Sequence, residues 1–158
     1  MQANTTNIVI KVQEEDFQLQ AEYSNVLNDK AVSGAVVTFT GLVRDFNDGR
    51  QVTGLALEHY PGMTEKALQQ IAEEAAQRWE LQAITVIHRV GRLSLGDQIV
   101  LVAIASRHRG DAFDACEFVM DYLKTQAPFW KKETTEQGDV WVEAKKSDQN
   151  KASSWSEG

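Results

Sequence analysis

The stretch Ile99-Val100-Leu101-Val102-Ala103-Ile104-Ala105 is apolar at every position and decides the fold of this 158-residue chain. A strand with one solvated face alternates apolar and polar residues, so an uninterrupted apolar run predicts a central strand that is covered on both sides. We expect this strand to span residues 98–106. It ends at the polar segment 106–109, after which Asp111 is placed to cap a helix that reaches about Gln126.

The rest of the chain mixes strands and helices without a strict alternation of the two, which predicts an α+β fold. β-branched and apolar segments predict strands over residues 8–12, 33–44, 52–60, 83–90, 129–134 and 139–144. Helices are expected over residues 17–27 and from Pro61 to about Trp79. The polar turn 45–50 suits a mobile loop. The expected architecture is a mixed or antiparallel sheet with packed helices and a small C-terminal β-subdomain.

Length and composition favour a single domain over residues 1–146, followed by a polar tail over 147–158 that we expect to be disordered. Cys116 is the one cysteine, which excludes an intrachain disulfide framework and a thiolate metal cluster. The sequence starts without a signal-peptide pattern, and no run approaches the roughly 20 apolar residues that span a bilayer. These features predict a cytoplasmic protein that does not bind membranes.

The charge distribution predicts a small anionic ligand and not a nucleic acid. The net charge is -7 and the isoelectric point is near 5.0, which argues against a general nucleic-acid-binding surface. Residues 84–109 nevertheless contain four arginines and one acid, together with His88 and His108. A locally basic region in an acidic protein favours a discrete anion site. The alternative is a solvated basic face that acidic helices balance.

Two lysines stand on either side of a predicted helix end. Pro128 disfavours a helical conformation at Ala127, so Lys124 is expected on the last helical turn and Lys131 on an extended segment after it. Two ammonium groups from different elements, next to the aromatic pair 129–130, predict a site for an anionic substrate.

The helical projection places Lys124 at the edge of a continuous apolar arc, between Met120 and Phe113. A lysine at such an edge can extend its stem along apolar surface and present its ammonium at the rim of a pocket, as a proton donor or nucleophile. The alternative is an ordinary boundary lysine, which the helix dipole favours near a C-terminus. Cys116 lies inside the same arc and is expected to be an inert core thiol.

A second candidate anion site lies at the end of the central strand. Ligands often bind at the carboxyl ends of strands, and a helix N-terminus offers free backbone N–H groups to an anion. His108 and Arg109 occupy this position, where the arginine can bind phosphate in a bidentate manner. A charged turn that only solvates the strand end is the alternative. Arg44 similarly ends a strand before a polar turn.

Motifs for other chemistries do not occur in the sequence. It contains no Gly-rich phosphate loop, no zinc-protease motif, no Cys-x-x-Cys pair and no nucleophile elbow. His59, His88 and His108 lack the spacing of metal ligands, and His59 is expected to pack structurally. We therefore expect neither a metal nor a cofactor.

Taken together, several segments resemble the large, catalytic subunit of molybdopterin synthase. They are Thr40–Arg44, Glu58–Met63, His88–Gly91, Ser106–Arg109 followed by Ala112-Phe113, and Asp121–Lys124 running on to Pro128–Glu133. The resemblance covers about residues 8–146 and implies the hammerhead-like fold of that family. Arg107 departs from it, because many relatives carry a small residue there.

The resemblance implies a sulfurtransferase of molybdenum cofactor biosynthesis. Such an enzyme converts cyclic pyranopterin monophosphate, or precursor Z, into the dithiolene molybdopterin. Sulfur would arrive as the C-terminal thiocarboxylate of a separate, small ubiquitin-like subunit that ends in Gly-Gly. The family pattern further implies a homodimer of large subunits with one small subunit at each outer end, which makes a heterotetramer.

The resemblance also implies residue roles. Lys124 and Lys131 would be catalytic, with Lys124 a proton donor or covalent attachment point and Lys131 near the thiocarboxylate and the substrate phosphate. The implied substrate-binding positions are Leu42, Val43, Arg44, His108, Arg109, Lys132 and Glu133.

Two other classes of function remain open from the sequence. A different phosphate-ligand enzyme or binding module would bind small phosphates whether or not a ubiquitin-like protein is present. A non-catalytic assembly subunit would bind its partner without any turnover to lose. The synthase hypothesis predicts both partner binding and a loss of turnover when Lys124 is replaced.

Overall fold

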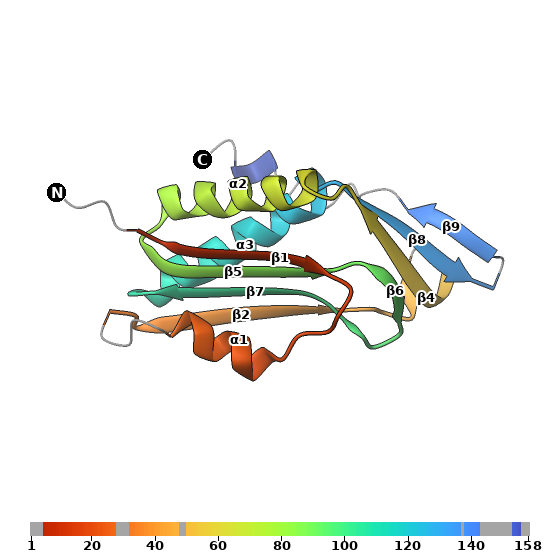
Figure 1. The fold of residues 1–158 in the computed structure, drawn as a ribbon, viewed down its shortest axis with the longest axis horizontal. Helices are drawn as coiled ribbons and strands as arrows, with labels where there is room; N and C mark the ends of the chain where they lie inside the picture. The colour runs from red at the N-terminus through yellow and green to blue at the C-terminus, as the bar shows by residue number, and fades with distance from the viewer. Residues whose placement is uncertain (1–4, 28–31, 48–49, 137, 143–152, 156–158) are drawn as a thin grey trace.

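The computed structural model describes residues 5–27, 32–47, 50–136, 138–142 and 153–155, in which two sheets pack with helices (Figure 1). The first sheet has the strand order β1-β5-β7-β2, with β1 parallel to β5 and the other pairs antiparallel. Its strands are β1 (Asn7–Gln13), β2 (Ala35–Leu42), β5 (Leu81–Arg89) and β7 (Gln98–Ser106).

The central-strand prediction is confirmed, because β7 lies inside the first sheet and is buried from Val100 to Ser106. Helices α2 (Met63–Arg78) and α3 (Arg109–Gln126) cover one face, and α1 (Leu19–Val26) covers the other (Figure 1). Alternate β7 residues therefore enter two separate cores. Ile104 packs with the α2 and α3 side chains, whereas Ala105 packs with Val26 of α1.

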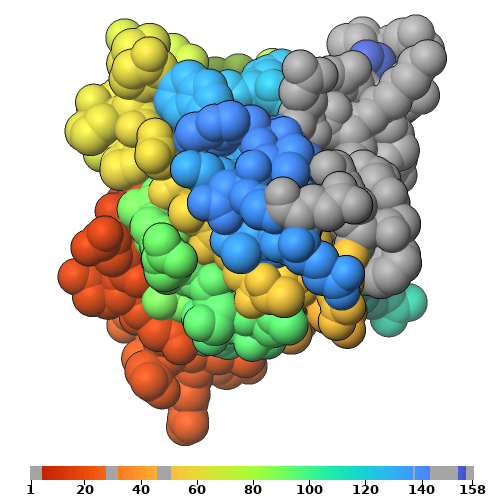
Figure 2. Space-filling model, turned by 90° about the vertical axis from the view of Figure 1, so that its right-hand side faces the viewer, coloured from red at the N-terminus to blue at the C-terminus, as the bar shows by residue number. Residues whose placement is uncertain are grey.

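The second sheet confirms the α+β prediction but is not built from the C-terminus alone. It contains β3 (Phe46–Asn47), β4 (Arg50–His59), β8 (Phe129–Thr135) and β9 (Gly138–Val142), with β6 (Gly91–Ser94) paired to β4. These strands form the surface at one end of the molecule, where β8 and β9 are blue, β4 is gold and β6 is green (Figure 2). Mid-chain β4 pairs with β8, so the C-terminal strands complete a sheet that begins far earlier.

Two local expectations are wrong. The turn 45–50 is not simply a loop, because β3 pairs with the start of β4 through Asn47 and Arg50. Helix α3 begins at Arg109 with His108 as its N-cap, so Asp111 lies within the first turn instead of capping it. The earlier start follows from the extended conformation of His108, whose N–H donates to the Ser106 hydroxyl at 3.4 Å.

Strand β6 and part of the α3 face escaped prediction. β6 is only four residues long and follows Gly91, whose positive φ of 83° sets a sharp turn after β5. On α3, Phe113 is 60% exposed and does not belong to the buried arc, whereas Phe118 and Tyr122 do. The face that packs on the sheet and on α2 is therefore rotated relative to the projection.

Part of the tail packs against the helices. The indole N–H of Trp155 donates to the Asp121 carboxylate at 2.6 Å, and its ring meets Trp79 and Phe118 edge to face. The remainder of the predicted tail, and its expected boundary after residue 146, lie outside the described residues. None of the described helices combines the length and the apolar character that crossing a membrane requires.

Candidate active site

Lys124 and Lys131 lie on the two elements that the sequence predicted for them. Lys124 is exposed on the last turn of α3, and Lys131 is the third residue of β8. Between them Ala127 adopts an extended conformation (φ -75°, ψ 132°), as a residue that precedes proline favours. The helix end and the strand start thus bring both lysines to one junction.

A buried hydroxyl holds the turn between the two lysines in place. Thr64, at the start of α2, has no exposed surface. Its Oγ1 donates to the Pro128 carbonyl at 3.2 Å and accepts from the Tyr60 N–H at 3.1 Å. The turn is therefore anchored to the first turn of α2 and not only to its own chain neighbours.

Strand periodicity divides the polar residues of β8 between two faces. Lys131 and Glu133 share the inner face, where Glu133 is 3% exposed and its carboxylate lies 4.0 Å from the Lys131 ammonium. Lys132 lies on the outer face, with its ammonium 3.7 Å from the Asp139 carboxylate and over the ring of Trp141. The structure therefore brings Glu133 to Lys131 and turns Lys132 away from both.

His88 is a member of this junction that the sequence interpretation did not assign to the site. Its ring stacks on Phe129 at 3.9 Å, and its Nδ1 lies 2.8 Å from the Arg89 carbonyl. Because a carbonyl can only accept, Nδ1 carries the proton and Nε2 keeps its lone pair. Burial, with smaller electrostatic contributions from Lys124 and His59, lowers the pKa of His88 to about 4, although the hydrogen bond to the Arg89 carbonyl acts in the opposite direction. His88 is therefore neutral near pH 7.

We refer to Lys124, Lys131, Glu133, His88 and Phe129 as the α3–β8 cluster. A signal for His88 was present in the sequence, because it continues the alternation of Ile84 and Val86, which face α2 and α3. A histidine at the end of an apolar row is normally a packing residue. Only the tertiary structure shows that Phe129 stacks on it there and that the charge of Lys124 acts on its pKa.

The lowered pKa of His88 predicts that the fold loses stability in acid. Below about pH 6.5 the unfolded chain binds a proton at His88 before the folded chain does, so stability falls until about pH 4. The contribution lost over that window is about 3 kcal/mol. We expect thermal melts of the wild type to shift downward from pH 7 to pH 4.5 by more than those of His88→Phe. Parallel curves for the two proteins would contradict this.

Arg44 lies at the same end of the first sheet as the α3–β8 cluster, whereas His108 and Arg109 lie at the opposite end. β2 is antiparallel to β7, so the end of β2 before Arg44 lies beside the start of β7. α3 runs back along β7 from Arg109, and Lys124 is fifteen residues further on, or about 22 Å at 1.5 Å per residue (Figure 1). Within one chain, one small ligand does not bridge Arg109 and Lys124.

The two residues before Arg44 have different surroundings. Leu42 is 53% exposed at the end of β2, next to an irregularity in the β2–β7 register. Val43 is buried in the apolar cluster that joins the two sheets, and its N–H donates to the Asp97 carbonyl at 2.9 Å. Val43 therefore fixes the chain that leads to Arg44, and Leu42 presents an apolar side chain at the surface.

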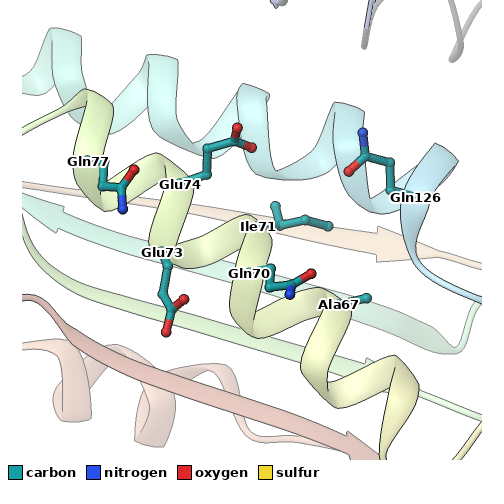
Figure 3. Close-up of a pocket in the computed structure, with 7 residues that line it drawn as sticks. All are labelled: Ala67, Gln70, Ile71, Glu73, Glu74, Gln77 and Gln126. Atoms are coloured by element: carbon teal, nitrogen blue, oxygen red, sulfur yellow. The ribbon is translucent and has the colours of Figure 1, made fainter.

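A groove of about 410 Å³ lies elsewhere, between α2 and α3 (Figure 3). Its lining includes Glu73, Glu74 and Gln126 but none of the cationic residues predicted to bind substrate. Carboxylates without a facing cation repel an anionic ligand, so this groove does not suit a phosphate. The predicted inert thiol is confirmed, since Cys116 is buried and burial raises the pKa of its thiol to about 12.

Comparisons with known proteins agree with one another. The family model described as MoaE protein matches residues 12–126. A molybdopterin synthase catalytic subunit of Ralstonia nicotianae (strain ATCC BAA-1114 / GMI1000) is 58% identical over 146 residues, which are 92% of this chain and 83% of the relative. One of Pseudomonas aeruginosa (strain PAO1) is 57% identical over 150 residues, or 95% of this chain and 100% of the relative. Among solved structures, the molybdopterin biosynthesis MoaE protein from Burkholderia ambifaria MC40-6 has a TM-score of 0.81 at 51% identity, covering 94% of this chain and 98% of that one.

Proposed function

The chain belongs to the MoaE family, and from that membership we propose how its residues transfer sulfur in the assembly of molybdopterin. It is a subunit of a sulfur-transferring enzyme of molybdenum cofactor biosynthesis. We place the reaction at the α3–β8 cluster, where the thiocarboxylate of a small ubiquitin-like subunit would meet cyclic pyranopterin monophosphate. The observation that carries this placement is the junction itself, where two lysines from different elements are held at one turn.

A separate sulfur carrier fits the chemistry of this chain. Cys116 is the one cysteine of the sequence, and its thiol is buried with a raised pKa, which suppresses the nucleophilic thiolate. The sulfur must therefore come from another molecule. The name that the relatives carry, catalytic subunit, also implies an enzyme with at least one further subunit.

The surroundings of the two lysines suggest different tasks. Lys131 lies beside the buried Glu133 carboxylate, which holds it as a fixed ammonium for the substrate phosphate and the thiocarboxylate. No carboxylate among the described residues lies within 4.0 Å of the Lys124 ammonium. We assign proton donation to Lys124.

The thiocarboxylate sulfur attacks a side-chain carbon of the pterin, so a C–S bond forms while the carbon–oxygen bonding pair at that carbon moves onto oxygen. The two ammonium groups stabilise the negative charge that builds there, and Lys124 delivers the proton. Water then cleaves the acyl C–S bond, which leaves the sulfur on the pterin and returns the small subunit with an ordinary C-terminal carboxylate.

We propose that each site is completed by a second copy of the chain. His108 and Arg109 stand at the far end of α3, so a homodimer can supply them to the lysines of its partner chain. The edge strand β2 carries Phe39, 40% exposed, and the neighbouring α3 carries the exposed Phe113. Among the described strands β2 pairs only with β7, and an edge strand with exposed aromatic residues suits a protein contact. The homodimer would form the core of a heterotetramer with two small subunits.

A single-turnover assay tests the function. The protein is mixed with precursor Z and the small subunit, and molybdopterin is measured through the fluorescence of its oxidised derivative. We expect product with the C-terminal thiocarboxylate and none with the matched subunit that ends in an ordinary carboxylate. Binding of the small subunit without product would indicate an assembly role. Binding of pterin phosphate that ignores the small subunit would indicate a different phosphate-binding protein.

A further inference from the structure

One buried hydroxyl at the start of α2 joins the end of β4 to the turn that precedes β8. Thr64 has no exposed surface, and its hydroxyl donates to the Pro128 carbonyl at 3.2 Å while it accepts from the Tyr60 N–H at 3.1 Å. A hydroxyl can donate its one proton and accept at its oxygen at the same time, so the single group satisfies both partners. Thr64 therefore bridges two segments that are far apart in the sequence.

Two further contacts fix the same place. The rings of Tyr60 and Trp130 meet edge to face, with their centroids 4.6 Å apart and their planes at 78°. The turn is also closed on itself, because the Phe129 N–H donates to the Ala127 carbonyl at 2.9 Å. The start of β8 is thus held by its own turn and by the start of α2.

The bond from Thr64 lies where the sheet ladder ends. Pairing of β4 with β8 begins at His59 and Phe129, so Pro128 precedes the first pair. Lys131 belongs to the third pair. The terminal pairs of a ladder open more readily than those in its middle. The hydrogen bond from Thr64 to Pro128 resists this opening at the end of β8 that carries Lys131.

We propose that Thr64 is a positioning residue for Lys131, in which the hydroxyl holds the Pro128 carbonyl and so sets where β8 presents the Lys131 ammonium to the reacting molecules. The proposal rests on the function proposed above. Lys124 does not need this hold, because it belongs to α3, whose inner face is buried along the whole helix. A displaced Lys131 ammonium would still attract an anion but would stabilise the transition state less.

Three variants separate the hydroxyl from the packing around it. Thr64→Val removes both hydrogen bonds with little change of volume, whereas Thr64→Ser keeps the hydroxyl. Ile71 is buried further along α2, in the core that α2 shares with α3 and the first sheet, so Ile71→Val loosens the same helix without touching the turn. Thr64→Val and Ile71→Val should each lower the melting temperature by about 2–4 °C.

The first measurement is the single-turnover rate constant at saturating precursor Z with the thiocarboxylated small subunit. We expect Thr64→Val to lower it by about tenfold, Thr64→Ser to keep it within about threefold of the wild type, and Ile71→Val to leave it unchanged. A wild-type rate in Thr64→Val would overturn the proposal. Equal losses in Thr64→Val and Ile71→Val, or in Thr64→Val and Thr64→Ser, would overturn it too.

Combination with Lys131→Ala tests whether Thr64 acts through that lysine. If it does, Thr64→Val should lower the rate constant of the Lys131→Ala protein by less than about twofold, because no ammonium is left to position. A residue that only stabilises the fold would cause the same loss in both backgrounds. A further loss of about tenfold in the Lys131→Ala protein would therefore contradict the proposed role.

Amide hydrogen exchange, followed by NMR in the free protein, does not depend on turnover. The Phe129 N–H should exchange about tenfold faster in Thr64→Val than in the wild type, and at the wild-type rate in Ile71→Val. Equal Phe129 rates in the wild type and Thr64→Val would overturn the proposal. If the wild type makes no molybdopterin while Thr64→Val still speeds Phe129 exchange, the proposed function is rejected and the hold of Thr64 on the turn stands.

Discussion

Replacing Lys124 with alanine should lower single-turnover product formation by about a thousandfold, which corresponds to ~4 kcal/mol of lost transition-state stabilisation. The variant removes the ammonium that we assign to proton donation, at a position where the side chain is exposed and packs little. The melting temperature should therefore stay within about 1–2 °C of the wild type, because exposed substitutions rarely change stability by more than about 0.5 kcal/mol. Lys124→Arg should stay inactive, since a guanidinium does not donate its proton near neutral pH.

Lys11→Ala is the matched control for Lys124→Ala. Lys11 is also exposed and lies on β1, where its ammonium is 3.6 Å from Glu22 of α1 on the opposite face of the first sheet. The Lys11→Ala variant should leave turnover unchanged. Turnover that survives Lys124→Ala, or a melting temperature that collapses with it, would show that Lys124 is not a purely catalytic residue.

Replacing Lys131 with alanine should lower turnover by about a hundredfold and should also destabilise the fold slightly. The activity loss follows from removing a fixed cation beside the substrate anion. The stability loss follows from removing a positive charge near the buried Glu133, and it should be about 1 kcal/mol because the Lys131 side chain is 39% exposed. We expect a melting temperature about 2–4 °C below the wild type.

Lys131→Arg separates the two roles of Lys131. Lys131→Arg keeps a cation near Glu133, so the melting temperature should return to the wild-type value. The variant should also retain at least about a tenth of the wild-type turnover. Lys131→Arg and Lys124→Arg therefore have opposite expected outcomes. If both arginine variants were equally inactive, the assignment of Lys131 as a fixed charge and Lys124 as the proton donor would be wrong.

Local signals predicted much of the fold and the placement of both lysines. The apolar run of β7 has no polar interruption, and Pro128 disfavours a helical conformation at the residue before it, so neither inference depends on distant residues. β6 was missed because it is short and is stabilised by pairing with β4, which is remote in sequence. The extent of the second sheet was missed for the same reason, since β4 and β8 pair across the whole of α2, β5, β7 and α3.

Two separations between residues of the site could have been inferred from the sequence but were not. The period of a strand already separates Lys132 from Lys131 and Glu133, because neighbouring residues point to opposite faces. The length of α3 already separates Arg109 from Lys124, because a helix rises by about 1.5 Å per residue. Grouping all of these residues by the family resemblance alone concealed both separations.

The burial of His88 and Glu133 did not follow from the sequence. The alternation of β5 places His88 on the face of Ile84 and Val86, but histidine is only intermediate in its tendency to be buried and glutamate is mostly exposed, so composition did not settle the burial of either residue. Glu133 is buried because β8 is covered on its inner face, and His88 because Phe129 lies on its ring. Both facts arise from tertiary contacts between segments that are far apart along the chain.

The measurement that tests the central claim most directly uses mixed dimers of a Lys124→Ala chain and an Arg109→Ala chain, purified through two different affinity tags. If each site combines the lysines of one chain with Arg109 of the other, one site of the mixed dimer carries both substitutions and the second carries neither. The mixed dimer should then regain about half of the wild-type turnover, although each parent dimer is inactive. A mixed dimer as inactive as its parents would contradict the composite site.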